Sequence, residues 1–185
     1  MNEIKNYIAF LKGINVGGKN IIKMADLRQY LSGNGLKNIR TFIQSGNILF
    51  ESEKIKEVIQ KEIEENIYKH YGFHVPVIIR TFQEFEQIVS QCPYSKTEIE
   101  IAEADKEVEV FYVALFNDSP SEEEIKKLSN VMSENESFKI INNNMYMRFT
   151  DSMRFSKLAA TLQKINTTNT VRNWKTINKL LSLTK

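Results

Sequence analysis

Residues 39–50, IRTFIQSGNILF, have the pattern of two short strands joined by a tight turn. Apolar and β-branched residues stand on both sides of the turn at 44–47, and Gly46 supplies the backbone freedom that a hairpin requires. We therefore predict strands over 39–43 and 48–50. The segments before and after this hairpin extend the pattern.

The surrounding sequence supplies the rest of a sandwich of helices and strands. The apolar run 7–11 is too short for a helix and predicts a strand that is buried on both faces. Apolar residues recur at helical spacing over 24–31, and again over 55–67 opposite a face of glutamates and lysines. A further apolar run follows at 75–79. The order β-α-β-β-α-β is that of a ferredoxin-like sandwich, in which helices cover one face of an antiparallel sheet.

The second half of the chain repeats this plan. We predict, in order, a short helix over 82–89, an acidic stretch over 98–109, a strand over 108–116, a helix that Pro120 opens, a hairpin over 138–149 turned by three asparagines, and a helix over 154–165. Because β-α-β-β-α recurs, the predicted fold class is α+β, with two ferredoxin-like βαββα subdomains related by internal duplication and a C-terminal helix. The predicted boundaries are 1–80 for the first subdomain, 81–107 for a helix and acidic connector, 108–165 for the second subdomain and 166–185 for a C-terminal docking helix.

The C-terminal segment begins with several helix-capping residue types and continues with an amphipathic pattern. The apolar members of the predicted helix face are Val171, Trp174, Ile177 and Leu181. The polar residues near its N-terminal end, where basic and amide groups can bind phosphate or carboxylate, are Arg172, Asn173, Lys175 and Thr176. The alternative is that Trp174 is a core anchor and the polar residues form a hydrated face.

Comparison of the two copies locates an insertion in the first. From Leu11 to Ile43 the chain advances 32 residues, whereas from Phe116 to Ile141 it advances 25. The excess of seven falls in the loop 12–20, KGINVGGKN. A loop longer than the architecture requires indicates a functional role, because ordering a loop costs entropy and connections are normally short.

The composition of this loop is that of an anion site. Gly17 and Gly18 let backbone amides approach a ligand, Lys19 offers charge, and a helix N-terminus follows. The loop is neither a Walker loop nor a GxGxxG motif, since the required spacings are absent. The alternative is that the two glycines only turn the chain and that Lys19 is a solvated surface residue.

Charge is segregated along the chain, although its 185 residues sum to a net charge of +2. Residues 1–50 carry a net +5, residues 51–147 a net −10 and residues 148–185 a net +7. If the fold brings the two basic ends together, their fields add and attract anions over about 8 to 10 Å in physiological salt. The alternative is that acidic and basic faces balance for solubility.

Composition also excludes several classes of protein. Hydrophobic residues make up 42% of the chain, and no apolar stretch approaches the roughly 20 residues that cross a bilayer. The N-terminus lacks the pattern of a secretory signal, and Cys92 is the single cysteine. We therefore expect a soluble, cytoplasmic protein without an intramolecular disulfide or a membrane partner, and we predict no particular oligomeric state.

The residue patterns of familiar enzymes are mostly absent. His70 and His74 are four residues apart, but Gly72 lies between them and no cysteine or carboxylate cluster completes a zinc set. Cys92 lacks an obvious histidine partner, and no histidine is placed by sequence to activate Ser45. The third strand lacks the basic-Gly-aromatic signature of RNA-recognition modules. The sequence thus predicts no metal, no cofactor and no catalytic residue.

Three segments carry a resemblance to a known family: YIAFLKGINVGGKNIIKMADLRQYL at 7–31, RTFIQSGNILF at 40–50 and TVRNWKTINKL at 170–180. Together and in this order they resemble the bacterial family called domain of unknown function 1697, over essentially the whole chain. The resemblance implies an α+β fold with two ferredoxin-like βαββα subdomains, and it implies no activity, ligand or catalytic residue. The positions of this chain that match the family's signature are Lys12, Gly13, Asn15, Val16, Gly17, Gly18, Lys19, Gln44, Ser45, Gly46, Asn47, Arg172, Asn173, Trp174 and Thr176.

The leading hypothesis is a cytoplasmic protein in which the loop 12–20, the turn 44–47 and the helix start 172–176 line one polar, basic pocket. The expected ligand is a phosphorylated or otherwise anionic molecule, with nucleic acid as a subsidiary candidate. The predicted ligand-binding residues are Lys12, Asn15, Gly17, Gly18, Lys19, Asn20, Gln44, Ser45, Asn47, Arg172, Asn173 and Lys175. Among them, Lys19 and Arg172 would supply charge, and the amide side chains would give directional hydrogen bonds. Two rivals are an enzyme that uses Ser45 or Lys19 on an anionic substrate, and a partner-binding scaffold whose surface is the acidic segment 98–109.

Overall fold

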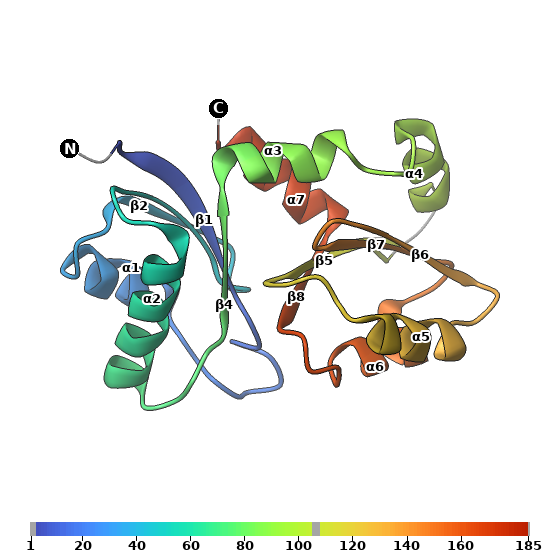
Figure 1. The fold of residues 1–185 in the computed structure, drawn as a ribbon, viewed down its shortest axis with the longest axis horizontal. Coiled ribbons are helices and arrows are strands. Elements are labelled where there is room, and N and C mark those ends of the chain that lie inside the picture. Colours follow the sequence, from blue (N-terminus) through green and yellow to red (C-terminus); the bar gives the residue numbers. More distant parts are fainter. Residues whose placement is uncertain (1–2, 105–107, 185) are drawn as a thin grey trace. The chain divides into compact units, whose positions relative to one another are not determined.

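The structure is a computed structural model that describes residues 3–104 and 108–184. The chain divides into two compact units, Met1–Glu86 and Gln87–Lys185. Each unit contains a four-stranded antiparallel sheet with two helices packed on one face (Figure 1). The α+β class with two βαββα-like sheets and a C-terminal helix, predicted from the sequence, is confirmed.

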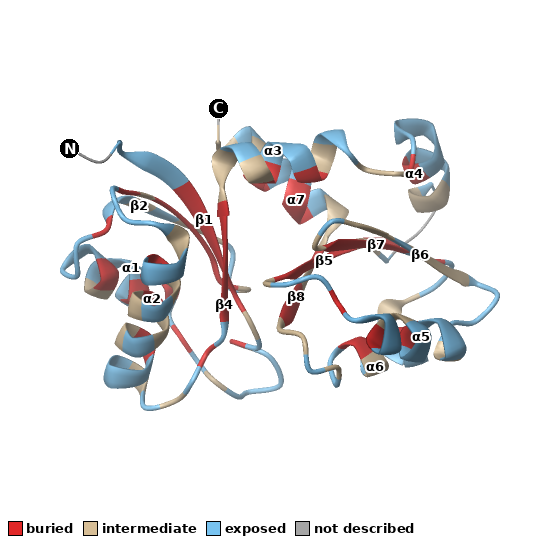
Figure 2. Ribbon diagram, in the orientation of Figure 1, coloured by how far each residue is buried: buried red, intermediate tan, exposed pale blue. Residues whose placement is uncertain are grey.

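The first unit follows the predicted succession of strands and helices. Its elements are β1 (Lys5–Leu11), α1 (Met24–Ser32), β2 (Lys37–Phe42), β3 (Asn47–Ser52), α2 (Lys56–Tyr71) and β4 (Val77–Thr81). The strands lie in the order β2-β3-β1-β4. The apolar stripes of α1 and α2, with Leu27 and Ile63 among their buried members, pack with one face of the sheet to form the core, and burial is strongest along β1, β3 and β4 (Figure 2). The left-handed Gly72 ends α2, as its position after the last apolar residue predicts.

The second unit has the same strand order, β6-β7-β5-β8. Its elements are α4 (Lys96–Glu103), β5 (Phe111–Phe116), α5 (Glu122–Val131), β6 (Glu136–Ile141), β7 (Asn144–Phe149), the 3-10 turn η1 (Met153–Phe155), α6 (Lys157–Leu162), β8 (Asn169–Asn173) and α7 (Trp174–Ser182). Helices α5 and α6 cover one face of this sheet, and α7 lies against the other (Figure 1). Helix α3 (Phe82–Ser90) spans the boundary between the two units.

The strand registers of the two sheets correspond residue by residue. Tyr7 of β1 lies opposite Thr81 of β4, and Tyr112 of β5 lies opposite Asn173 of β8. In both sheets the fourth strand ends at this pair and leads directly into a helix of nine residues. Helix α3 follows β4, and helix α7 follows β8. The internal duplication therefore extends through a fourth strand and a further helix in each copy.

The C-terminal segment is the main correction to the predicted elements. The prediction of one helix from the capping residues onward is wrong for Asn169–Asn173, which form β8 and pair with β5. A sequence of asparagines, threonine, valine and arginine has little of the apolar character that marks a strand, so the pairing partner decides its conformation. The helix α7 that follows buries Ile177 and Leu180, whereas Trp174 is only half-buried.

Three smaller predictions also change. The acidic stretch 98–109 contains most of α4, whose start is fixed by a capping box between Ser95 and Glu98; residues 105–107 of that stretch lie outside the described residues. The helix predicted over 154–165 is divided into η1 and α6, because Ser156 caps a new helix with a hydrogen bond to the amide of Ala159. The strand predicted from residue 108 begins at Phe111.

Candidate functional site

The connection after the first strand is the largest difference between the two copies. Residues 12–23 join β1 to α1, whereas only residues 117–121 join β5 to α5. The first connection is longer by seven residues, which confirms the insertion predicted from the sequence. The loop 12–23 is therefore not required by the fold, since the second unit forms the same sheet without it.

Asn15 holds the base of this loop. Its side-chain Nδ2 donates to the carbonyl oxygens of Ile22 at 2.9 Å and Gln44 at 2.8 Å, and its Oδ1 accepts from the amide of Ile22 at 2.9 Å. The side chain thus pairs with Ile22 much as a neighbouring strand would, and it joins the loop to the hairpin turn between β2 and β3. Its positive φ of 55° is one that asparagine tolerates better than most residues.

Buried apolar side chains also hold the base of the loop. Ile14 and Ile22 are 2% and 1% exposed, so both ends of the loop insert into the core. Gly46 of the hairpin turn lies so close to Ile14 that a Cβ atom there would be 2.7 Å from the Ile14 Cδ1 and 2.7 Å from the Leu11 Cβ. The glycine of the turn is required both for its φ of 79° and for this close approach.

The tip of the loop is a small exposed hairpin. Val16 and Lys19 form an isolated antiparallel bridge, with the Lys19 amide donating to the Val16 carbonyl at 3.1 Å. Gly17 and Gly18 have φ values of 58° and 74°, the pattern of a two-residue turn with positive φ at both central positions. The glycines do turn the chain. Within the described residues their amide N–H groups have no hydrogen-bond partner, and both glycines are exposed.

The charge of the loop is entirely positive. Residues 12–23 contain Lys12, Lys19 and Lys23 and no acidic residue. Within residues 3–104 and 108–184, Lys12 and Lys19 have no ion pair, whereas Lys23 lies near enough to Asp26 to help lower the pKa of that carboxyl. Partial burial lowers the pKa of Lys12, because removing an ammonium from water disfavours its charged form. An anion that approached this loop would meet cations that the described chain does not neutralise with a carboxylate.

The hairpin turn contributes one exposed and two internally bonded side chains. Asn47 is fully buried, and its Nδ2 donates to the Phe42 carbonyl at 3.0 Å and to Ser45 Oγ at 3.2 Å. Gln44 is exposed. Ile43, a β-branched residue, has a φ of 52°, which is a strained conformation for such a side chain. Asn47 therefore holds the turn together, and Gln44 presents its amide to solvent.

The three predicted residues of the second unit lie on a strand end and a helix start. Arg172 is 6% exposed on β8, and its Nη1 donates to Thr170 Oγ1 at 2.8 Å and to the Val171 carbonyl at 2.9 Å. Burial lowers the pKa of Arg172 to about 10. Asn173 caps α7, since its Oδ1 accepts from the Thr176 amide at 2.8 Å. Lys175 is exposed, with Nζ 4.0 Å from a carboxylate oxygen of Glu109.

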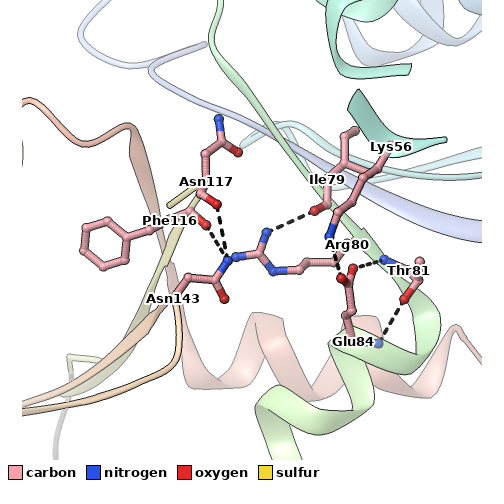
Figure 3. A network of polar contacts seen from close by, with 8 residues as sticks. All are labelled: Lys56, Ile79, Arg80, Thr81, Glu84, Phe116, Asn117 and Asn143. Atoms are coloured by element: carbon pink, nitrogen blue, oxygen red, sulfur yellow. Dashed lines mark hydrogen bonds and ion pairs between the residues drawn. The ribbon is translucent and has the colours of Figure 1, made fainter. Parts of the chain in front are cut away.

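A second buried arginine, which the sequence analysis missed, occupies the equivalent place in the first unit. Arg80 of β4 is 4% exposed, and its Nη1 donates to the carbonyl of Ile79, the residue before it, at 3.0 Å (Figure 3). Arg172 bonds to the carbonyl of its own preceding residue in the same way. The residue after each arginine, Thr81 or Asn173, accepts a hydrogen bond from an amide three positions on. The signal in the sequence is the recurrence of arginine, a capping residue and an aromatic residue at 80–82 and 172–174.

Figure 3 also shows the contacts that hold the end of β4 in the first unit and the end of β5 in the second. Glu84 accepts hydrogen bonds from the Thr81 amide at 2.8 Å and from Lys56 Nζ at 2.6 Å, and these contacts with Arg80 nearby hold its pKa below the usual value despite burial. In the second unit Asn143 Nδ2 donates to the carbonyl of Phe116 at 3.1 Å. Both sets of contacts join the end of one strand to a neighbouring segment.

The predicted site residues thus fall into two groups. Those of the first unit lie on two segments that the Asn15 to Gln44 hydrogen bond joins: Lys12, Asn15, Gly17, Gly18, Lys19, Asn20, Gln44, Ser45 and Asn47. Within this group, Asn15, Asn20 and Asn47 use their amides for structure; Asn20 Nδ2 donates to the Gly13 carbonyl at 3.2 Å. Arg172, Asn173 and Lys175 belong to the second unit.

Other chemical groups of the chain are engaged in packing. His70 stacks on Tyr30 with ring centroids 4.1 Å apart, and His74 stacks on Tyr68 at 4.2 Å. Burial raises the pKa of the Cys92 thiol.

Across residues 3–104 and 108–184 there is no group of three or more His, Cys, Asp or Glu side chains arranged to hold a metal ion. Over the same residues, every helix is too short or too polar to span a bilayer.

Comparison with known proteins assigns the chain to a family. A family model described as "Protein of unknown function (DUF1697)" matches residues 4–146. The chain belongs to the DUF1697 family. The matched region contains the loop 12–23 and the hairpin turn, and it ends before β8. No curated protein matches the chain.

A solved structure extends the comparison to the whole fold. The conserved bacterial protein SP0830 from Streptococcus pneumoniae is similar with a TM-score of 0.77 and 24% sequence identity, over 99% of this chain and 100% of that chain. At this identity the likeness concerns the fold. The fold, with two four-stranded sheets and a C-terminal helix, is therefore similar to that of a solved bacterial protein of different sequence.

Proposed function

We propose that this protein binds an anionic ligand through the loop 12–23, and that a phosphorylated small molecule is the favoured class. The observation that carries the proposal is the loop itself: it exists only in the first of two matching copies, and it is cationic throughout. Segments that the scaffold does not need are where binding residues are usually found.

Contacts within the chain hold the base of the loop. Asn15 pins its base with three hydrogen bonds, and Ile14 and Ile22 are buried on either side. Because the segment is already fixed, binding would not have to supply the entropy of ordering it. This favours recognition of a small anion over adaptation to many partners.

The exposed groups of the tip have the chemistry of phosphate recognition. The amides of Gly17 and Gly18 can donate to anionic oxygens, and Lys19 adds a mobile ammonium. Gln44, held next to the loop base through its own carbonyl, adds a neutral donor. The part assigned to Arg172, Asn173 and Lys175 remains a prediction of the sequence.

A thermal-shift screen over nucleotides, sugar phosphates, polyphosphate and a short single-stranded oligonucleotide tests the proposal. A ligand present at 100 times its Kd raises the free energy of unfolding by about 2.7 kcal/mol. The double variant Lys12→Gln, Lys19→Gln should weaken binding of any hit at least about tenfold, because two cations are lost. The matched control is Lys61→Gln, an exposed lysine of α2 in the same unit, which should bind as the wild type does.

The salt dependence of a hit separates the ligand classes. A nucleic acid that contacts several lysines should lose affinity steeply as salt rises, whereas a single phosphate group should show a shallow slope. If no anion stabilises the wild type, or if the double variant and the Lys61→Gln control bind equally, the loop is not an anion site.

A further inference from the structure

A cavity of about 430 Å³ opens in the first unit, and no part of the anion proposal uses it. Its volume lies within the range of about 300 to 1,000 Å³ that is usual for small-molecule pockets. The residues that matter for its chemistry are Asn6, Asn38, Arg40, Glu51 and Phe82. It lies at the opposite end of the sheet from the loop 12–23: Asn6 and Glu51 pair where β1 begins, whereas Phe10 and Asn47 pair beside the loop.

An irregularity in β2 shapes this cavity. The register of β2 against β3 shifts between Lys37 and Arg40, and Asn38 within the shift has a φ of 52°. Asn38 Nδ2 donates to Oε2 of Glu51 at 2.8 Å. Such bulges bend an edge strand and redirect its side chains, and they recur next to binding sites. Here the bulge lets the edge strand diverge from β3 and orients the Glu51 carboxylate.

The cavity contains both signs of charge. Arg40 pairs with Leu49 on β3, and Glu51 is two residues along the same strand, so the two side chains share one face of the sheet. Diagonal neighbours of this kind are about 7 to 8 Å apart. Glu51 Oε1 and the Asn6 amide have no hydrogen-bond partner within residues 3–104 and 108–184. Arg40 has an interaction of its own, but a guanidinium has five donors and can serve a ligand as well.

The remaining lining is apolar. The ring of Phe82, the first residue of α3, is half-buried at the edge of the cavity. A ligand that fits this lining carries a positive group for Glu51, a negative group for Arg40 and an apolar side chain. Removing an apolar side chain from water is favourable, so this contact would add to affinity.

We propose that this cavity binds a zwitterionic α-amino acid with an apolar side chain. The Glu51 carboxylate accepts hydrogen bonds from the ligand ammonium, the Arg40 guanidinium donates to the ligand carboxylate, and the ligand side chain packs on Phe82. The Asn6 amide gives a further directional hydrogen bond to the ligand carboxylate.

Calorimetric titration with L-leucine, L-methionine and L-phenylalanine tests this assignment. At least one of these should bind, and its amide, which lacks the carboxylate, and its N-acetyl form, which lacks the ammonium, should each bind at least about tenfold more weakly. Glu51→Gln should weaken the free amino acid to a similar degree and leave the N-acetyl form unchanged. Gln at 51 still offers an oxygen to Asn38, so the bulge is retained.

The matched control is Glu53→Gln, a neighbouring carboxylate whose partner is Lys37 at 3.2 Å and which does not line the cavity. It should bind as the wild type does. Lys12→Gln, Lys19→Gln should also leave amino-acid binding unchanged, which separates this site from the anion loop. Absence of heat with all three amino acids at millimolar concentration, equal binding of the blocked forms, or equal binding by Glu51→Gln would each overturn the assignment.

Discussion

The two copies of the sheet have similar buried residues at equivalent strand positions, and they differ in the length of the connection after the first strand. Arg80 and Arg172 occupy the same register position, as do the buried asparagines Asn47 and Asn144 at the start of β3 and β7. The connections after β1 and β5 differ by seven residues. The comparison teaches that the shared residues support the architecture, and that the loop 12–23 is the part of the first copy that needs another explanation.

The same difference changes how the following helix begins. Helix α5 starts directly after its short connection with a capping box of Ser121 and Glu124, whereas Lys23 before α1 makes no side-chain cap. In the first unit the hydrogen bonds of Asn15 take over the work of fixing the chain before the helix. A long loop thus replaces a local cap with a contact between distant residues.

The largest effect is expected at the turn that the loop packs against. Gly46→Ala places a Cβ 2.7 Å from Ile14 and Leu11 at a φ of 79°, so overpacking and backbone strain together should lower the free energy of unfolding by about 3 kcal/mol. The equivalent residue of the second copy is Asn143, whose carbonyl accepts from Phe116 as that of Gly46 accepts from Leu11. Urea denaturation of Gly46→Ala and Asn143→Ala compares how much each substitution lowers the free energy of unfolding. Equal, small losses would contradict the close packing of the loop.

Glu124 should show the next largest effect, and it depends on pH. This buried carboxylate accepts from Thr167 Oγ1 at 2.6 Å, from the Thr167 amide and from the Ser121 amide, and these bonds lower its pKa to about 2. Glu124→Gln should cost about 2 kcal/mol at pH 7.

The sign of the pH dependence follows from the lowered pKa. The contribution of Glu124 is complete above its ordinary pKa of about 4.3 and is lost as the pH falls toward about 2. The gap in stability between wild type and Glu124→Gln should therefore narrow as the pH falls from 5 to 2. Denaturation curves at several pH values test this, with the exposed Glu123→Gln as control. A gap of constant size would refute the role of ionised Glu124.

Asn15→Ala should cost about 1 to 2 kcal/mol and free the loop. It removes three hydrogen bonds and leaves alanine at a φ of 55°. Amide exchange at Ile22, whose N–H bonds to Asn15 Oδ1, should accelerate far more than exchange in β5. Asn15→Gly, which removes the bonds without the φ penalty, should accelerate exchange equally and cost less. Unchanged protection at Ile22 would show that the loop is held in another way.

Gly18→Ala should have the smallest effect on stability. Its φ of 74° disfavours alanine, but no atom lies within 4 Å of the added Cβ, so the cost should be about 1 kcal/mol or less. The ratio of this loss to that of Gly46→Ala, measured in the same urea titration, distinguishes a glycine kept for backbone freedom from one kept for packing. A loss as large as that of Gly46→Ala would place the tip in contact with the core.

The sequence predicts the parts of this molecule that depend on short-range patterns. Apolar runs mark β1, β3 and β4, helical spacing marks α1 and α2, and counting residues between matched strands locates the inserted loop. Strand β8 escapes because its polar residues are extended through pairing with β5.

The roles of the side chains in the candidate site are harder to predict from the sequence than the position of the site along the chain. Asn15, Asn20 and Asn47 have the composition of ligand-binding residues, yet each amide bonds to the backbone of this chain. Arg80 has no charge pattern that separates it from a surface arginine, and its only signal in the sequence is the recurrence of residues 80–82 at 172–174. These asparagine bonds reach carbonyl oxygens five or seven residues away within loops and turns, and hydrophobic periodicity carries no information about such contacts.

The partly buried Cys92 has a practical consequence for all of these measurements. It is the single thiol of the chain, and burial raises its pKa. Since the thiolate is the form that reacts with alkylating reagents, a raised pKa slows the labelling of Cys92 in the folded chain relative to an unfolded one. Because Cys92 is the single cysteine, the rate of its alkylation can be followed in unfolding experiments without an engineered labelling site.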